Sequence, residues 1–170
     1  MISVAYVQRM VRYNRWQNEN LYDSADRLTD EERQRERGAF FGSMQKTLSH
    51  LLWGDQLWMH RFGAADPPSP GIPQSASLYP DWPALMSRRR AFDAEVVKWA
   101  DGLDADWLAG ELTYYSQSAA RDVSGPKWVF VTHFFNHQTH HRGQVHCMLS
   151  QAGAKLQDTD LVVMPDPAAG

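Results

Sequence analysis

The sequence is most informative in the stretch HFFNHQTHHRGQV, residues 133–145. This stretch lies inside a segment that begins at Pro126 and contains no other proline before Gly153. Proline is favoured at the start of a helix, and glycine just after its end. We therefore predict one long helix that begins at Pro126, ends near Gln151 and has Gly153 as its C-cap.

One face of this predicted helix is rich in histidine, since five of the seven histidines of the chain fall between residues 133 and 146. At about 100° per residue, four of them share a single arc of about 100° with Gln144; they are His133, His137, His140 and His141. Side chains four residues apart on a helix lie about 6 Å apart, so a His-x-x-x-His pair can hold one transition-metal ion. Both His133 with His137 and His137 with His141 have this spacing, and periodicity does not choose between them. A solvated helix surface is the alternative interpretation.

A stable metal site needs a third ligand from another element. His50 lies among apolar residues in the middle of a predicted helix over residues 43–61, which makes it the sensible donor. A lone histidine on an apolar face is more often a hydrogen-bonded core residue, and that alternative stays open. Three neutral imidazoles would leave the ion its full charge, so a bound water would be strongly acidified.

Periodicity and capping residues predict the other elements. Apolar residues at steps of three and four indicate a helix over residues 3–28, and Thr29 with Glu32 resembles a capping box that opens a short charged turn ending near Gly38. Residues 63–81 hold five prolines and two glycines, and we expect a long loop there. Asp81 then caps a third long helix that ends before Gly102.

The remaining segments complete the predicted fold. Residues 111–116 and 121–123 indicate a short hairpin, and residues 161–165 an extended arm or strand. We therefore predict an all-α protein: a single domain over residues 1–170, folded as an up-and-down four-helix bundle. A long Pro-rich loop joins its second and third helices, and the short hairpin precedes the fourth.

Two amides interrupt the apolar stripe of the first helix. Burying an amide without partners costs about 1–3 kcal/mol, so we expect Asn14 and Asn18 to be hydrogen-bonded. They could accept from the free ring N–H of a metal-binding histidine or orient a metal-bound water, and Gln144 is a candidate for the same role. Ordinary hydrogen bonds between helices or across a dimer interface are the alternative. We expect the single cysteine, Cys147, to be a small core residue.

Charge and composition exclude several classes of partner. Lys and Arg total 17 against 20 Asp and Glu, which gives a net charge of −3. The basic run of residues 88–90 is too short to supply the positive surface that nucleic acids or anionic membranes require. A single cysteine excludes an internal disulfide and fits a reducing cytoplasm. The sequence shows neither a signal peptide nor a membrane span of about 18 apolar residues. We therefore expect a cytoplasmic protein with no nucleic-acid or membrane partner.

Residues 133–145 resemble the fourth-helix signature of the DinB family, N-H-x-x-H-H-R-G-Q. Residues 47–55 (TLSHLLWGD) resemble the second-helix histidine motif of that family, and residues 13–16 (YNRW) its first-helix pattern. The likeness extends over nearly the whole chain. It implies a four-helix bundle, often dimeric, in which three histidines hold a divalent metal. By motif position these ligands are His50, His137 and His141, with His133 and His140 outside the ligand set.

The resemblance also suggests an activity. The better-understood relatives are similar to metal-dependent enzymes that act with low-molecular-weight thiols, such as mycothiol or bacillithiol S-transferases and a maleylpyruvate isomerase. It thus implies a homodimer in which zinc or nickel activates a thiol or water for attack on a small electrophilic substrate. A metal-dependent hydrolase is one alternative. Because no strong general acid or base is visible beside the motif, a non-catalytic, stress-related metal- or ligand-binding bundle is the other.

Overall fold

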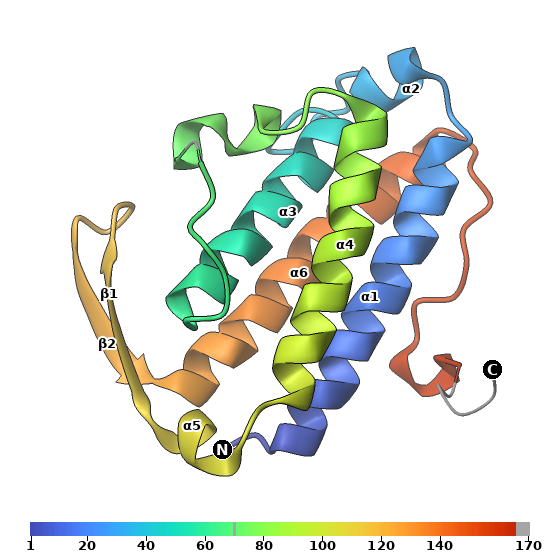
Figure 1. Ribbon diagram of the computed structural model, residues 1–170. Coiled ribbons are helices and arrows are strands. Elements are labelled where there is room, and N and C mark those ends of the chain that lie inside the picture. The colour runs from blue at the N-terminus through green and yellow to red at the C-terminus, as the bar shows by residue number, and fades with distance from the viewer. Residues whose placement is uncertain (70, 166–170) are drawn as a thin grey trace.

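Helices make up most of the chain in the computed structural model, which describes residues 1–69 and 71–165 (Figure 1). In chain order the elements are α1 (Val4–Asp26), α2 (Asp30–Gln34), α3 (Met44–Arg61), the 3-10 helix η1 (Ile72–Ser77), α4 (Trp82–Asp101), α5 (Ala105–Ala109), β1 (Glu111–Ser116), β2 (Arg121–Pro126), α6 (Lys127–Gln151) and the 3-10 helix η2 (Leu161–Val163). Within the described ranges, none of these helices is long and apolar enough to cross a membrane.

Side-chain caps begin the helices close to where the sequence predicts them. In each case an oxygen accepts a hydrogen bond from the backbone N–H three residues on; the capping residues are Ser3, Thr29, Ser43 and Asp81. At the other end of α6, Gly153 follows the C-cap Ala152 and has φ of 75°, a left-handed conformation that glycine adopts without strain. Local chemistry therefore fixes where α1, α3 and α4 begin and where α6 ends.

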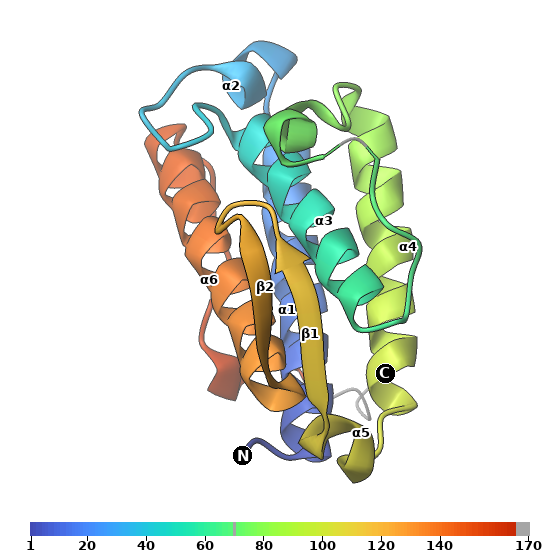
Figure 2. The ribbon, with the colours of Figure 1, turned by 90° about the vertical axis from the view of Figure 1, so that its left-hand side faces the viewer.

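The four long helices, α1, α3, α4 and α6, pack side by side around an apolar core (Figures 1 and 2). The helices α1 and α6 run in one direction, and α3 and α4 both run in the other. Side-chain contacts agree with these directions. The antiparallel neighbours are linked by Arg12–Asp101, Asp23–Arg90, His50–His141 and Trp58–Phe130, and the parallel pair α1 and α6 by Tyr6–Phe135 and Tyr13–Arg142.

The predicted up-and-down order is therefore wrong for the middle pair, because α3 and α4 are parallel. Residues 62–69 and 71–81 return along the whole length of α3 before α4 begins (Figure 1). The side chain of Gln45, at the start of α3, accordingly donates a 2.6 Å hydrogen bond to the carbonyl of Pro80, just ahead of α4. A helix of 18 residues is about 27 Å long, a distance that a connection of this length crosses easily, whereas a short loop forces antiparallel neighbours. This connection also contains η1 and is not wholly loop.

The hairpin and the C-terminal arm lie outside the bundle. Strands β1 and β2 pair antiparallel from Glu111↔Pro126 to Ser116↔Arg121, as a longer hairpin than the sequence predicts, and they lie in front of α3 and α6 in Figure 2. The arm after α6 packs along α1, where Gln17 donates a 3.0 Å hydrogen bond to the carbonyl of Asp158. Residues 161–163 form η2 and not a strand.

The expectation for Cys147 is also wrong, because this residue is exposed on α6. The inward positions of that turn are occupied by its neighbours Val145, Met148 and Leu149, which are 0–2% exposed. The phase of the helix therefore turns the thiol toward solvent.

Candidate metal centre

Three histidines from two helices converge on one point in the bundle. His50 comes from α3, and His137 and His141 come from adjacent turns of α6. One ring nitrogen of each lies within 4.8 Å of the corresponding nitrogens of the other two. Their ring centroids are 4.6–5.4 Å apart. We call these three residues the histidine cluster. Of the two pairs that the helical spacing allows, the structure therefore favours His137 with His141 over His133 with His137.

The other histidines of α6 lie outside the cluster. The ring of His133 packs against Trp58 at 5.0 Å and faces His137 at 6.2 Å. His140 is exposed, although its ring is 4.9 Å from that of His141. His146 lines a separate cavity between α1 and α6. Helical phase thus separates two inward-facing imidazoles of α6 from three that point elsewhere.

The cluster is buried in an environment that keeps its imidazoles neutral. His50 and His141 are only 8% and 7% exposed. Burial, together with neighbouring histidines, lowers the pKa of His50 to about 4 and that of His137 to about 3, and burial also lowers the pKa of His141. A neutral imidazole carries the nitrogen lone pair that a metal ion binds.

Two rings of the cluster have oriented partners on their Nδ1 atoms. The Nδ1 of His141 lies 2.9 Å from Oε1 of Gln144; because an amide oxygen only accepts, this Nδ1 carries the proton and Nε2 keeps its lone pair. The Nδ1 of His50 lies 2.8 Å from the hydroxyl of Ser75 on η1, which is 1% exposed. Partners of this kind fix the orientation of metal-binding rings. Gln144 was a sequence candidate for this role, whereas Ser75 was not identified from the sequence.

His137 has a different environment. Its Nδ1 is buried and has no hydrogen-bond partner among the described residues. Such a nitrogen is unusual in a folded protein, and a bound metal ion satisfies the lone pair of an imidazole nitrogen directly. The ring packs against the backbone of Gly54 on α3, where a Cβ would lie only 2.7 Å from Cε1 of His137. The donor set of the cluster therefore fits a divalent transition-metal ion.

Aromatic rings cover one side of the cluster. Phe41, in the turn before α3, stacks on His50 with centroids 4.0 Å apart and lies 5.6 Å from His141. The ring of Trp53 is also stacked with that of His50, with centroids 5.8 Å apart. His137 is less buried than its two partners in the cluster. Nothing in the sequence identified Phe41.

The asparagines of α1 do not contact the cluster. The Nδ2 of Asn18 donates a 3.0 Å hydrogen bond to Asp93 on α4, which matches the alternative of an ordinary hydrogen bond between helices. Asn14 is buried, and neither its amide nitrogen nor its amide oxygen has a hydrogen-bond partner in the described part of the chain. A role for Asn14 beside the metal therefore stays a prediction.

Asp93 belongs to a buried ionic network that ties the long helices together. Arg89 of α4 binds Asp55 of α3 at 2.6 Å and Asp93 at 2.7 Å, and all three are at most 5% exposed. Burial raises the pKa of Asp55, and raises that of Asp93 to about 6 despite the opposing charge of Arg89. On α6, Gln138 accepts a 3.0 Å hydrogen bond from Arg142.

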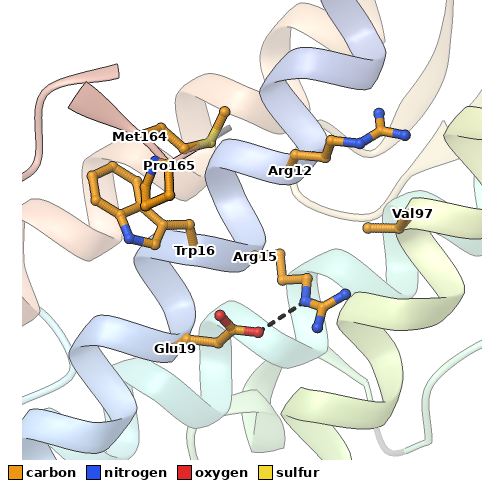
Figure 3. Close-up of a pocket in the computed structure, with 7 residues that line it drawn as sticks. All are labelled: Arg12, Arg15, Trp16, Glu19, Val97, Met164 and Pro165. Atoms are coloured by element: carbon orange, nitrogen blue, oxygen red, sulfur yellow. Dashed lines mark hydrogen bonds and ion pairs between the residues drawn. The ribbon is translucent and has the colours of Figure 1, made fainter. Parts of the chain in front are cut away.

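Figure 3 shows a surface cavity that is distinct from the cluster. It measures about 310 Å³, lies between α1, α4 and the C-terminal arm, and is lined by Arg12, Arg15, Trp16, Glu19, Val97, Met164 and Pro165. None of these residues belongs to the histidine cluster, and Arg15 is paired with Glu19 at 2.8 Å. We therefore assign the candidate chemistry to the cluster and not to this cavity.

Fold and site together define a class of protein: a helical bundle whose interior holds a three-histidine cluster that could bind a metal ion. The model of the DinB family matches residues 1–169, and the chain belongs to this family. Its fold is similar to that of a DinB-like protein from Bacillus cereus, known from a crystal structure. The two are 18% identical with a TM-score of 0.63, over 84% of this chain and 90% of the other. No curated protein matches the sequence.

Proposed function

We propose that the protein is a metal-dependent enzyme in which His50, His137 and His141 hold a divalent ion, zinc or nickel. The observation that carries this proposal is the convergence of three imidazoles, two of them buried and one partly buried, whose ring nitrogens lie within 4.8 Å of one another. When bound, such an ion lowers the pKa of a coordinated thiol or water and so supplies a nucleophile near neutral pH.

The surrounding residues prepare the cluster for this chemistry. Ser75 and Gln144 orient two of the rings through their Nδ1 atoms. Phe41 and Trp53 exclude water from the side of His50. With three protein ligands in a site of this type, one coordination position stays open to a small molecule.

Transfer of a low-molecular-weight thiol to a small electrophile is the reaction that we favour. Within the described ranges, the group that could hold a metal contains three histidines and no Asp or Glu. A hydrolase commonly uses a carboxylate beside the metal as general base, as in H-E-x-x-H proteases. A thiol needs less help, because its ordinary pKa near 8.5 is already close to neutral.

The same proposal includes a homodimer that works in the cytoplasm. The single cysteine supports the location, since an exposed free thiol persists in a reducing compartment. Analytical ultracentrifugation of the purified protein tests the dimer.

Metal analysis of the protein as purified, followed by activity assays, tests the proposed function. We expect about one zinc or nickel ion per chain, and conjugation of a thiol to a fluorogenic electrophile by metal-loaded but not by chelated protein. His50→Ala should lose both metal and activity, with His146→Ala as the matched control. Metal-dependent cleavage of esters without thiol conjugation would indicate the hydrolase. Full metal occupancy with neither activity would indicate a binding protein.

A further inference from the structure

Arg61, in the last turn of α3, has an unusual environment for an arginine. Its guanidinium carbon lies 4.6 Å from the ring centre of Trp58 and 3.9 Å from that of Tyr114 on β1. The side chain is half-buried, and burial lowers its pKa. Other arginines of the bundle, such as Arg12 and Arg89, are paired with carboxylates. Arg61 forms no ion pair and donates no hydrogen bond within the described part of the chain.

Arg61 lies on the same side of α3 as the histidine cluster. It follows His50 by three helical turns, which places it about 16 Å along the axis and only about 20° around it. The space between is bridged by His133, whose ring is 5.0 Å from Trp58 and 6.2 Å from His137. His133 is exposed and Arg61 is half-buried, so a ligand can reach both side chains from solvent.

We propose that Arg61 binds a carboxylate of the substrate, so that the substrate is an extended anion with its reacting group at the histidine cluster. The distance between the two groups would be roughly 10–16 Å, the helix spacing less the reach of the arginine. This inference rests on the proposed function, because it concerns the other end of the substrate that would react at the histidine cluster. Arg61 would act as a specificity-determining residue.

The geometry of Arg61 suits a carboxylate in particular. The guanidinium packs against two aromatic rings whose planes stand 79° apart, and its N–H groups are left to form the two parallel hydrogen bonds that a carboxylate accepts. The rings also exclude water, and a charge-assisted hydrogen bond is stronger where water is excluded. Because the chain carries a net charge of −3, general attraction of anions does not explain a preference for them.

Glutathione and two derivatives test this proposal by calorimetry with zinc-loaded protein. Glutathione carries a thiol and two carboxylates, glutathione diethyl ester lacks the free carboxylates, and S-methylglutathione lacks the free thiol. We expect the diester to bind wild-type protein about 10-fold more weakly than glutathione does, the size of effect typical for a lost charge-assisted hydrogen bond. Arg61→Met should abolish this preference without changing zinc content, and Arg61→Lys should keep part of it. Arg90→Met, which removes an exposed arginine on α4, is the matched control.

The outcomes separate this inference from the proposed function. Equal binding of glutathione and its diester by wild-type protein overturns the role of Arg61 and needs no variant. The same conclusion follows if the preference survives in Arg61→Met, or if no carboxylate probe binds at millimolar concentration. S-methylglutathione cannot form a thiolate, so Arg61-dependent binding of this probe supports the carboxylate site even if no metal-dependent thiol transfer is found. Thiol transfer that is indifferent to Arg61 and to esterification supports the proposed function alone.

Discussion

Replacing Gly54 with alanine is expected to weaken metal binding while leaving the fold intact. A Cβ at this position would lie 2.7 Å from Cε1 of His137, whereas ordinary carbon contacts are about 3.5–4.0 Å. The imidazole would therefore have to move by about 1 Å, although metal–nitrogen distances are fixed to within about 0.2 Å. We expect zinc affinity to fall by about 10- to 100-fold, as it does when other supports of metal ligands are lost.

The helix itself should tolerate the same change. Gly54 does not have a positive φ, and alanine in a helix interior is favoured over glycine by up to about 1 kcal/mol. The metal-free Gly54→Ala protein should consequently unfold at a temperature no lower than that of wild type, provided that His137 can move aside.

Competition with a chromophoric zinc chelator measures the affinity, and thermal unfolding of metal-free protein measures the stability. Gly143→Ala is the matched control, because it makes the same change on α6 where a Cβ would meet nothing within 4 Å. Unchanged zinc affinity in Gly54→Ala would refute the reasoning, since it would mean that the position of the His137 ring does not matter for the metal.

Three further predictions address the cluster and the core. Alanine at His50, His137 or His141 should remove most of the bound metal in elemental analysis, whereas His133→Ala should not; full occupancy in the His50 variant would contradict the ligand set. Metal-free protein should lose stability as the pH falls from about 6.5 towards 4. In this range the histidines of the unfolded chain, with an ordinary pKa of 6.5, take up protons. In the folded chain they do not, because burial holds the pKa of His50 at about 4 and that of His137 at about 3. Buried Asp93, whose pKa is raised to about 6, acts in the opposite direction, so the comparison with His137→Ala is decisive. Urea midpoints should fall less with pH in His137→Ala than in wild type, and the same dependence in both proteins would show that His137 is not buried in solution. Arg89→Met should lower the free energy of unfolding in urea by about 3 kcal/mol or more, because it leaves the buried carboxylates of Asp55 and Asp93 without their cation. Arg90→Met is the control: it removes only the exposed Arg90–Asp23 pair and should lower the free energy of unfolding by about 1 kcal/mol at most. Equal effects of these two variants would argue against the buried network.

The long helices could be predicted from the sequence because their determinants are local. Ser43 and Asp81 cap helices within three residues of themselves, and the positive φ of Gly153 follows α6 directly. The inward face of α6 is equally local, since helical periodicity alone places His137 and His141 one turn apart. Such features need no knowledge of the rest of the chain.

The direction of α4 could not be predicted in this way. Five prolines in residues 63–81 show that the segment cannot be one helix, but composition does not say where an irregular chain goes. Its path depends on distant contacts, such as that of Ser49 on α3 with the carbonyl of Ser75 at 3.0 Å. The parallel arrangement of α3 and α4 thus follows from tertiary packing.

Buried charges were likewise hidden in the sequence. The three consecutive arginines at 88–90 have the composition of a solvated surface, yet Arg89 is only 2% exposed. Its burial depends on Asp55, which is 34 residues away on another helix. In the site, Gly54 did leave a sequence signal, because glycine is unfavourable inside a helix and usually has a packing reason there. Phe41 and Ser75 left none, since each reaches His50 only through the folded chain.

The separation of the clustered histidines along the chain has a consequence for how long the protein persists. His50 and His141 are 91 positions apart in the sequence, so an ion held by both would close a loop of about that length. Because the ion would leave when the chain unfolds, it would stabilise the folded state by mass action, by about 4 kcal/mol when free metal is about 1,000 times its dissociation constant, roughly as much as a disulfide would. Unlike a disulfide, this crosslink is reversible and needs no oxidant. If the proposed function holds, the supply of metal would therefore set the fraction of chains that are unfolded and open to proteolysis. A shortage of metal would then lower the amount of protein as well as the activity of each chain.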